Sequence, residues 1–397
     1  MSREEVHKDC MNALCKSNVV LLELPTGYGK SKESIDLVNW ISKAVYKDRK
    51  PKMLLLVAKT VHKQTWRDEF EKWGGIEADV TIECYESLKK YEKASFDIIV
   101  ADECHHLGSD SRQRLLKSIR YGYIIGLSAT IPQKLKLWFS YFFHSETVSC
   151  DIIEAIDSEV LPEPTILLYP LKVENTRMSE TIEVNPKAKG PIAYGEYKDI
   201  WKYKKSKQHA ILKCTQKQKL FELDKLIEWY KKKTMTGNMA MKQSWLYMCG
   251  KRLEFLADCK MPIVKMILQK LDDERTITFC KTIEQCEKLG KNCIHSQNKD
   301  ATRIYNKFNE GKIDHITAVN ILNENANLVN CKYAIFDNLS SSDLVVFQRL
   351  GRALRHKSPV IIIPYYEGTR EQELVEKLSE DFNMDYIKCI QSISEIQ

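Results

Sequence analysis

The sequence predicts an α/β protein with two parallel-sheet domains in tandem and a helical, lysine-rich insert in the second domain. Three observations lead to this fold class. The chain has 397 residues, more than one typical hydrophobic core organises. Strand-like and helix-like segments alternate from the start to roughly residue 150, and alternation returns from residue 276. A proline-bearing segment, residues 157–170, lies between these parts, so we predict domains at 1–158 and 159–397.

The first domain contains several apolar runs of strand length. They cover residues 19–22, 53–58, 80–84, 96–101 and 123–127. After the first run, residues 32–46 carry apolar side chains at helical spacing, among them Ile35 and Val38. Strands that alternate with helices indicate a parallel sheet covered on both faces.

The second domain is expected to begin with a strand at residues 166–168 and then to be interrupted by an insert of about 181–271. Within the insert, residues 181–197 predict a hairpin that turns at Pro186–Gly190, and residues 199–271 predict helices. Alternation then resumes. Strands are expected at 276–280, near 294, at 315–319, 333–336 and 360–363, and helices at 283–289 and 301–309.

The composition is that of a soluble globular protein, with 43% hydrophobic and 29% charged residues. No apolar run is long enough to span a bilayer, and the first residues lack the apolar core of a signal peptide. The thirteen cysteines are therefore expected to be reduced thiols in a cytoplasmic protein, and their spacing does not suggest zinc. The net charge of +7 permits a polyanionic partner.

A glycine turn directly follows the first strand. Because a helix follows this turn, its context is that of a phosphate-binding loop, in which backbone N–H groups surround the phosphates. Lys30 is expected to neutralise the β and γ phosphates, and Ser31 to bind Mg²⁺. The general pattern has a glycine at the position of Leu24, and an ordinary glycine turn is the alternative. The residues of the loop are Pro25, Thr26, Gly27, Tyr28, Gly29, Lys30 and Ser31.

Two acids close the apolar strand at 96–101. Parallel sheets bind ligands at the carboxyl ends of their strands, so Asp102 is expected to hold Mg²⁺ and Glu103 to polarise an attacking water. A lone Asp-Glu pair is often merely solvated, but the glycine turn ends a strand of the same predicted sheet. His105 and His106 follow, and we expect them to relay contacts between the domains rather than to bind a metal.

A third cluster lies in the second domain, where Gln348, Arg352 and Arg355 recur at helical intervals. An arginine presented from a second domain can stabilise the charge of a phosphoryl transition state. A basic surface helix is the alternative interpretation.

Together these motifs resemble the superfamily 2 helicases and translocases. More narrowly, the chain is similar to the DEAD/DEAH-related group that includes the type I and III restriction-enzyme motors and many phage-encoded helicases. Residues 57–66, 85–88, 128–130 and 277–282 extend the resemblance, which runs from roughly Val19 to Arg355. It implies two RecA-like domains that use ATP and Mg²⁺ to move on nucleic acid.

The resemblance also implies roles for single residues. Gln348 and Arg352 would approach the γ phosphate, and Arg355 would be the arginine finger. The chain departs from the family pattern at Asn325 and Asn327. Asn325 can adopt the left-handed backbone of the usual glycine, whereas Asn327 removes a carboxylate that would bind ribose or tie motifs together.

Other positions carry roles in coupling and in binding the strand. Ser128 and Thr130, together with His105, would link the nucleotide state to contact between the domains. The residues expected to hold the phosphodiester backbone of a nucleic-acid strand are Lys59, Thr60, Tyr85 and Ser87. Contacts with the phosphodiester backbone position a nucleic-acid strand without reading its sequence.

The insert contains eight lysines between residues 196 and 220, with aromatic residues interleaved. We expect Lys202, Lys204 and Lys205 to bind a nucleic-acid backbone while neighbouring rings stack on bases. The alternative is a solvated helix whose Trp201 and Tyr203 pack inward.

The predicted function is that of an ATP- and Mg²⁺-dependent helicase or translocase, with DNA as the substrate because the proteins it resembles act on DNA. Three alternatives stay open at this point. They are an RNA helicase, a catalytically weak nucleic-acid-binding scaffold, and a motor subunit of a larger complex. ATP turnover with each polymer distinguishes the first two.

Overall fold

The computed structural model describes residues 1–184, 202–203, 210–237, 240–319, 328–339, 356–381 and 384–396. The chain forms two compact units. Met1–Pro164 makes up the main part of the first unit, and the second consists mainly of Thr165–Leu322 and Val360–Gln397. No helix among the described residues is long and apolar enough to cross a membrane.

The first unit contains a six-stranded sheet in the order β3-β2-β4-β5-β1-β6. All neighbouring strands are parallel. The five predicted strands are confirmed, whereas β6 was not predicted because only one of its four residues, Val148, is apolar and buried. The strands are β1 (Val19–Glu23), β2 (Lys52–Val57), β3 (Asp79–Cys84), β4 (Ser95–Asp102), β5 (Arg120–Ser128) and β6 (Glu146–Ser149).

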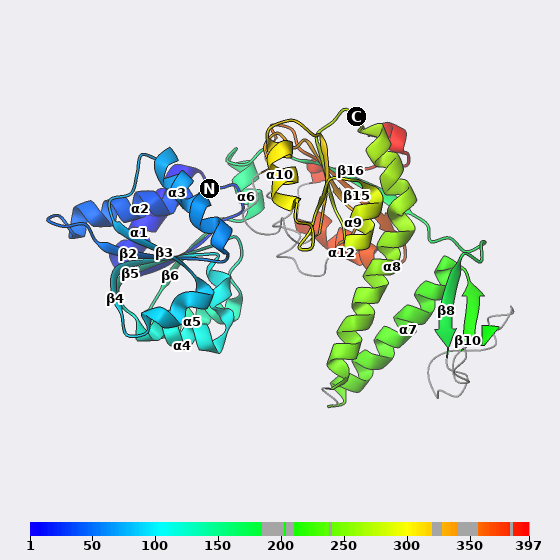
Figure 1. Ribbon diagram of the computed structural model, residues 1–397, viewed down its shortest axis with the longest axis horizontal. Helices are drawn as coiled ribbons and strands as arrows, with labels where there is room; N and C mark the ends of the chain where they lie inside the picture. The colour runs from blue at the N-terminus through cyan, green and yellow to red at the C-terminus, as the bar shows by residue number, and fades with distance from the viewer. Residues whose placement is uncertain are drawn as a thin grey trace. The chain divides into compact units, whose positions relative to one another are not determined.

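Helices cover both faces of this sheet, as the alternation predicted. Figure 1 shows α1 (Arg3–Lys16), α2 (Lys30–Val45) and α3 (Thr60–Lys72) on one face, and α4 (Asp110–Ser118) and α5 (Gln133–Phe143) on the other. Burial on both faces explains why the central strands are continuous apolar runs. The described part of this unit also contains three short helices: η1 (Tyr85–Tyr91), η2 (Cys104–Gly108) and α6 (Ile152–Asp157).

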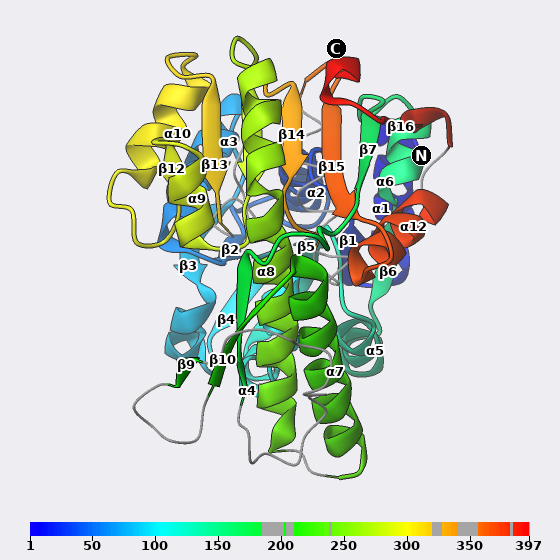
Figure 2. The same cartoon turned by 90° about the vertical axis from the view of Figure 1, so that its right-hand side faces the viewer.

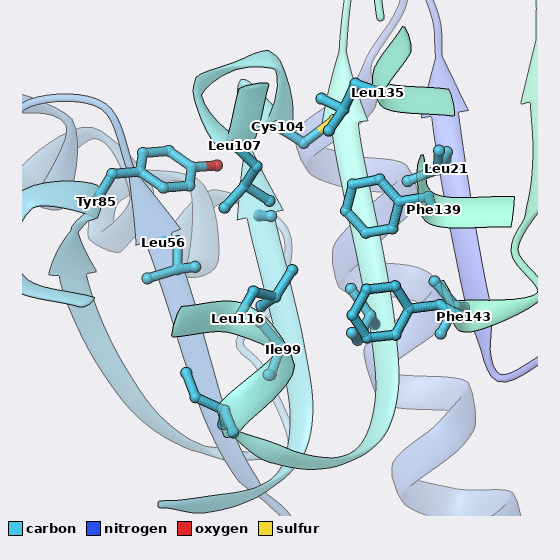
Figure 3. Packing of buried hydrophobic residues seen from close by; sticks show 14 of the residues in the cluster. Leu21, Leu56, Tyr85, Ile99, Cys104, Leu107, Leu116, Leu135, Phe139 and Phe143 are labelled. Carbon is cyan, nitrogen blue, oxygen red and sulfur yellow. The ribbon is translucent and has the colours of Figure 1, made fainter. Parts of the chain in front are cut away.

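The core beneath α4 and α5 joins strands that are distant in the sequence (Figure 3). Leu21, Leu56 and Ile99 project from three different strands, while Phe139 and Phe143 reach them from α5. Each such side chain contributes roughly 1.5–3 kcal/mol when fully buried. This packing holds the strand ends, and the loops that follow them, in fixed positions.

The second unit contains a seven-stranded sheet, again with all neighbours parallel, in the order β12-β13-β11-β14-β15-β7-β16. The predicted strands are confirmed, and β16 was missed because it has only three residues. Two parallel sheets with helical connections confirm the predicted fold class. The strands are β7 (Thr165–Leu171), β11 (Thr276–Phe279), β12 (Cys293–Ile294), β13 (His315–Ala318), β14 (Tyr333–Phe336), β15 (Val360–Tyr366) and β16 (Ile387–Cys389).

Long helices and a small antiparallel sheet accompany the seven-stranded sheet in the second unit. Figures 1 and 2 show α7 beside α8, with the small sheet close to α7. The C-terminal half of α8 packs on the large sheet through Val264, Ile267 and Leu271. The other elements that the described residues form in this unit are α7 (Gln216–Met235), α8 (Met241–Lys270), α9 (Ile283–Leu289), α10 (Ala301–Asn309), α12 (Arg370–Asp381), η5 (Met384–Tyr386), η6 (Ile393–Glu395), β8 (Glu180–Val184), β9 (Lys202–Tyr203) and β10 (Ala210–Cys214).

The predicted helical segment at 199–271 is wrong at its beginning. Lys202–Tyr203 and Ala210–Cys214 are strands, and helix begins only at Gln216, after a capping box formed by Thr215 and Gln218. Of the predicted hairpin at 181–197 only residues 181–184 are described, and these belong to β8, which pairs with β10 in antiparallel register, Ile182 opposite Leu212. The expected turn at Pro186–Gly190 lies outside the described residues. Pairing between segments so far apart overrode the local pattern.

Candidate nucleotide-binding and catalytic site

The glycine turn joins the end of β1 to the start of α2. Gly27 and Gly29 have φ values of 98° and 111°, a backbone region that favours glycine. Gly29 is the N-cap of α2, and Lys30 is the first residue of that helix. The Lys30 ammonium donates to the carbonyl oxygens of Leu24, at 2.9 Å, and Pro25, at 3.3 Å. The positive charge is thus held at the loop, where the N-terminal end of α2 also favours an anion.

Tyr28 anchors this loop to the N-terminal helix. Its hydroxyl lies 3.0 Å from the Met1 carbonyl oxygen and 2.9 Å from that of Ser2. Arg3 donates through Nε to the Tyr28 carbonyl oxygen at 3.2 Å. Burial raises the pKa of the Tyr28 hydroxyl above its ordinary value, so this group stays a neutral donor. The side chain therefore fixes the loop on α1, and only the Tyr28 backbone belongs to the glycine turn.

Asp102 is the last residue of β4, and its side chain is buried. Trp66, in α3, donates its indole N–H to Asp102 Oδ2 across 2.9 Å. The hydroxyl of Tyr85 donates to the Asp102 carbonyl oxygen at 2.7 Å. The sequence did not indicate that either side chain contacts Asp102. Trp66 recurs with His62 and Phe70 at a spacing of four residues, a pattern that predicts only the buried face of a helix.

Glu103 adopts left-handed backbone geometry, with φ 51°. This conformation costs a residue with a side chain about 1–2 kcal/mol, and such strain tends to persist at functional sites. Its Oε2 lies 3.4 Å from Ser128 Oγ and 3.4 Å from His105 Nδ1. The strained turn thus holds the carboxylate of Glu103 close to Ser128, the last residue of β5, and to His105 in η2.

The predicted coupling residues form one network around Glu103. Ser128 donates through its hydroxyl to the Thr130 carbonyl oxygen at 2.8 Å. Since a hydroxyl has a single hydrogen to donate, His105 Nδ1 is the donor in its 3.0 Å contact with Ser128 Oγ. Glu23, which the sequence analysis did not single out, accepts from the Ile131 N–H at 2.7 Å and also binds Lys136. The loop after β5 is therefore tied to the last residue of β1.

Strand register explains why these side chains converge. Glu23 in β1 lies opposite Ser128 in β5, and Asp102 in β4 lies opposite Leu127 in the same strand. The glycine turn, the two acids and the serine therefore emerge at one edge of the sheet. Two strand spacings separate the ends of β1 and β4, roughly 10 Å. The hard oxygen donors present, the Asp102 carboxylate and the Ser31 hydroxyl, are of the type that Mg²⁺ prefers.

The residues predicted to contact nucleic acid fall into two groups. Lys59 and Thr60 are exposed at the start of α3, and Ser87 is partly exposed in η1. Tyr85 requires a correction, because its side chain is 2% exposed and packs in the core with Leu56 and Leu107 (Figure 3). Because the Tyr85 ring is buried in the protein core, it is not accessible to a nucleic-acid strand.

Of the lysines predicted to bind nucleic acid in the insert, Lys202 lies in β9. Several other predicted site residues lie outside the described ranges. The residues outside the described ranges are Lys204, Lys205, Asn325, Asn327, Gln348, Arg352 and Arg355. Their roles stay predictions.

Comparison with known families identifies the chain. Residues 76–133, which include both acids and the coupling residues, match the family model of the type III restriction enzyme res subunit. Residues 259–357 match the model of the helicase conserved C-terminal domain. The chain is a superfamily 2 helicase. The resemblance inferred from the motifs is confirmed, while the phage-encoded branch stays a prediction.

Individual proteins agree with this assignment. The helicase is 22% identical to the DNA 3'-5' translocase XPB2 of Sulfurisphaera tokodaii over 403 residues, which cover 94% of this chain and 83% of the relative. Its fold is similar to the Hef helicase domain of Pyrococcus furiosus, with TM-score 0.51, 13% identity, and coverage of 94% and 97%. An S. cerevisiae Dbp5 variant bound to RNA and ADP BeF3 gives TM-score 0.59 at 11% identity, covering 98% of this chain and 89% of that one.

The family assignment also fixes the class of enzyme. As a superfamily 2 helicase, the protein is a nucleic-acid-dependent ATPase. This confirms the predicted use of ATP.

Proposed function

We propose that this helicase hydrolyses ATP with Mg²⁺ held by Asp102 and Ser31, and that hydrolysis drives translocation along DNA. The observation that carries the proposal is the convergence of Lys30, Asp102 and Glu103 at one edge of the first sheet. These groups supply a cation for phosphates, an acid for the metal and an acid for water, the set that phosphoryl transfer to water requires.

Each residue has a distinct task in this proposal. Lys30 and the start of α2 bind the phosphates, and bound Mg²⁺ would neutralise charge that develops on their oxygens. Glu103 orients the attacking water and accepts its proton, while His105, whose Nδ1 lies 3.4 Å from Glu103 Oε2, holds the Glu103 carboxylate in place. On the sequence resemblance, we assign stabilisation of the transition-state charge to Gln348, Arg352 and Arg355.

DNA is favoured as the track because the relative from S. tokodaii is described as a DNA translocase. Exposed groups at the starts of α3 and η1, namely Lys59, Thr60 and Ser87, are suited to phosphate oxygens. The similar S. cerevisiae structure holds RNA, which keeps an RNA track as the second candidate. A cytoplasmic location is proposed as well, since all thirteen cysteines are free thiols.

ATP turnover with different polymers tests this function directly. We expect single-stranded or forked DNA to raise the rate of ATP hydrolysis above the rate with ATP alone, because binding of a DNA strand favours the catalytically active conformation. The measurement compares single-stranded DNA, duplex DNA, forked DNA and RNA in parallel. Stimulation by RNA alone would make the protein an RNA helicase, and absence of turnover with every polymer would leave only a binding scaffold.

The insert provides a second test of strand binding. Reversing the charges of Lys202, Lys204 and Lys205 to Glu should weaken DNA binding and flatten its salt dependence by about 0.7 in log–log slope per lost phosphate contact. A fluorescence-anisotropy titration at several salt concentrations measures this. Reversal of Lys43, Lys47 and Lys50 is the matched control, because these lysines adjoin the end of α2 and the start of β2, opposite the catalytic edge. An unchanged slope in the insert variant would show that these lysines do not contact the DNA.

A further inference from the structure

Trp66 and Tyr85, which have no role in the proposed reaction, both donate hydrogen bonds to Asp102. The indole N–H of Trp66 binds Asp102 Oδ2 at 2.9 Å, and the Tyr85 hydroxyl binds the Asp102 main-chain oxygen at 2.7 Å. Trp66 is 3% exposed and Tyr85 is 2% exposed, so both bonds are shielded from water. A bond to an ionised carboxylate is stronger than one between neutral groups, and burial strengthens it further.

These two donors belong to the segments that are expected to meet the nucleic-acid strand. Trp66 lies in α3, the helix that begins with exposed Thr60 after Lys59. Tyr85 is the first residue of η1, which also carries Ser87. From Thr60 to Trp66 the helix rises only about 9 Å. A short helix moves as one body, so a shift of its first turn moves the indole as well.

We propose that Trp66 is a positioning residue that sets the orientation of the Asp102 carboxylate, and that Trp66 and Tyr85 couple strand contact to metal binding. This inference rests on the proposed function. The indole N–H restrains rotation of the carboxylate about its Cβ–Cγ bond. Mg²⁺ requires near-ideal octahedral geometry, so a small rotation of one ligand weakens its binding. Partners of metal ligands commonly act in this way.

The chain offers a variant and a matched control that separate this role from packing. Trp66 also packs against Phe70, with 5.7 Å between ring centroids, so Trp66→Phe keeps an aromatic ring and removes the donor. Trp73 follows the same helix and donates its indole N–H to Glu69 Oε2 at 2.6 Å. Its side chain is exposed and its indole N–H binds Glu69 rather than Asp102, so Trp73→Phe removes a similar bond without touching Asp102.

The test measures metal affinity without turnover. Mn²⁺ serves as the probe, bound together with a non-hydrolysable ATP analogue and quantified by electron paramagnetic resonance. We expect Trp66→Phe to lower Mn²⁺ affinity about 10-fold, the lower end for loss of a partner of a metal ligand. Trp73→Phe should bind Mn²⁺ like the unaltered protein. Equal Mn²⁺ affinity in the Trp66→Phe, Trp73→Phe and unaltered proteins would overturn the positioning role.

A second measurement tests the coupling. The ratio of DNA-stimulated to basal ATP turnover should fall in Trp66→Phe and in Tyr85→Phe, whereas Trp73→Phe should keep it. An unchanged ratio in both former variants would overturn the coupling. If the unaltered protein hydrolyses no ATP with any polymer, the proposed function fails, and the Mn²⁺ measurement still decides whether Trp66 positions Asp102. Thermal unfolding confirms that each variant is folded, and Tyr85→Phe carries the coupling test if Trp66→Phe is not.

Discussion

Glutamine in place of Glu103 should stop ATP turnover while leaving the nucleotide bound. An amide cannot accept the proton of the attacking water, and general-base catalysis typically contributes ~10²–10⁴-fold to the rate. The phosphate-binding groups, Lys30 and the start of α2, stay intact in this variant. Single-turnover hydrolysis of ATP measures the loss, and equilibrium binding of a fluorescent ATP analogue measures retained affinity.

Two further variants make that result specific. Glu77→Gln is the matched control, because Glu77 is exposed and forms an ion pair with Lys43 at the surface, so turnover should not change. Lys30→Ala should lose binding as well as turnover, since its ammonium is the cation held at the loop. If Glu103→Gln hydrolyses ATP as fast as Glu77→Gln, Glu103 is not the base and the catalytic assignment is wrong.

Methionine in place of Lys260 should destabilise the second unit by about 3–5 kcal/mol, the usual cost of removing one partner of a buried ion pair. Lys260, in α8, lies 2.6 Å from Glu371 Oε1 in α12, and both side chains are at most 1% exposed. The ammonium also donates to the Pro364 carbonyl oxygen at 3.2 Å, and Glu371 Oε2 accepts from the Tyr366 N–H at 3.1 Å. The pair thus ties two helices to β15, and its loss leaves a buried carboxylate without a counter-charge.

Urea-induced unfolding followed by circular dichroism measures this effect. Lys251→Met is the matched control, because Lys251 lies in the same helix and pairs with Glu254 at 2.9 Å on the surface. Such exposed pairs contribute only about 0–1 kcal/mol. The double variant Lys260→Met/Glu371→Gln should be more stable than Lys260→Met, since a buried amide costs less than a buried charge and can still accept from Tyr366. Equal losses in Lys260→Met and Lys251→Met would contradict the expected role of the pair.

Sequence periodicity predicted the large sheets well. The strands at β1, β4 and β14 were predicted almost to the residue, because runs buried on both faces consist almost entirely of apolar side chains. The pattern failed for β6 and β16, which contain four and three residues and too few apolar side chains to signal burial. It also failed at Ala210–Cys214, where a lysine-rich context suggested helix but β8 supplies the pairing.

In the candidate catalytic site, the sequence indicated the positions of the acids and of the glycine turn but not their hydrogen-bond partners. Lys30, Asp102 and Glu103 stand at strand or helix ends, positions where the sequence pattern itself indicates a ligand. Trp66 and Tyr85 gave no such signal, because an aromatic side chain at helical spacing looks the same whether or not its polar atom binds a catalytic residue. The opposite error occurred for Tyr85, whose motif predicted contact with a nucleic-acid strand although its side chain is buried.

By itself the sequence determined the α/β class, the glycine turn after the first strand, the paired acids at the end of another strand, and the superfamily. These depend on contacts between residues that are close along the chain, and so they leave a local pattern. Only the tertiary structure decided that Trp66 and Tyr85 hold Asp102, that Glu23 ties the loop after β5 to the end of β1, and that Lys260 pairs with Glu371. Those contacts form between segments brought together by packing, and packing is a property of the whole folded unit.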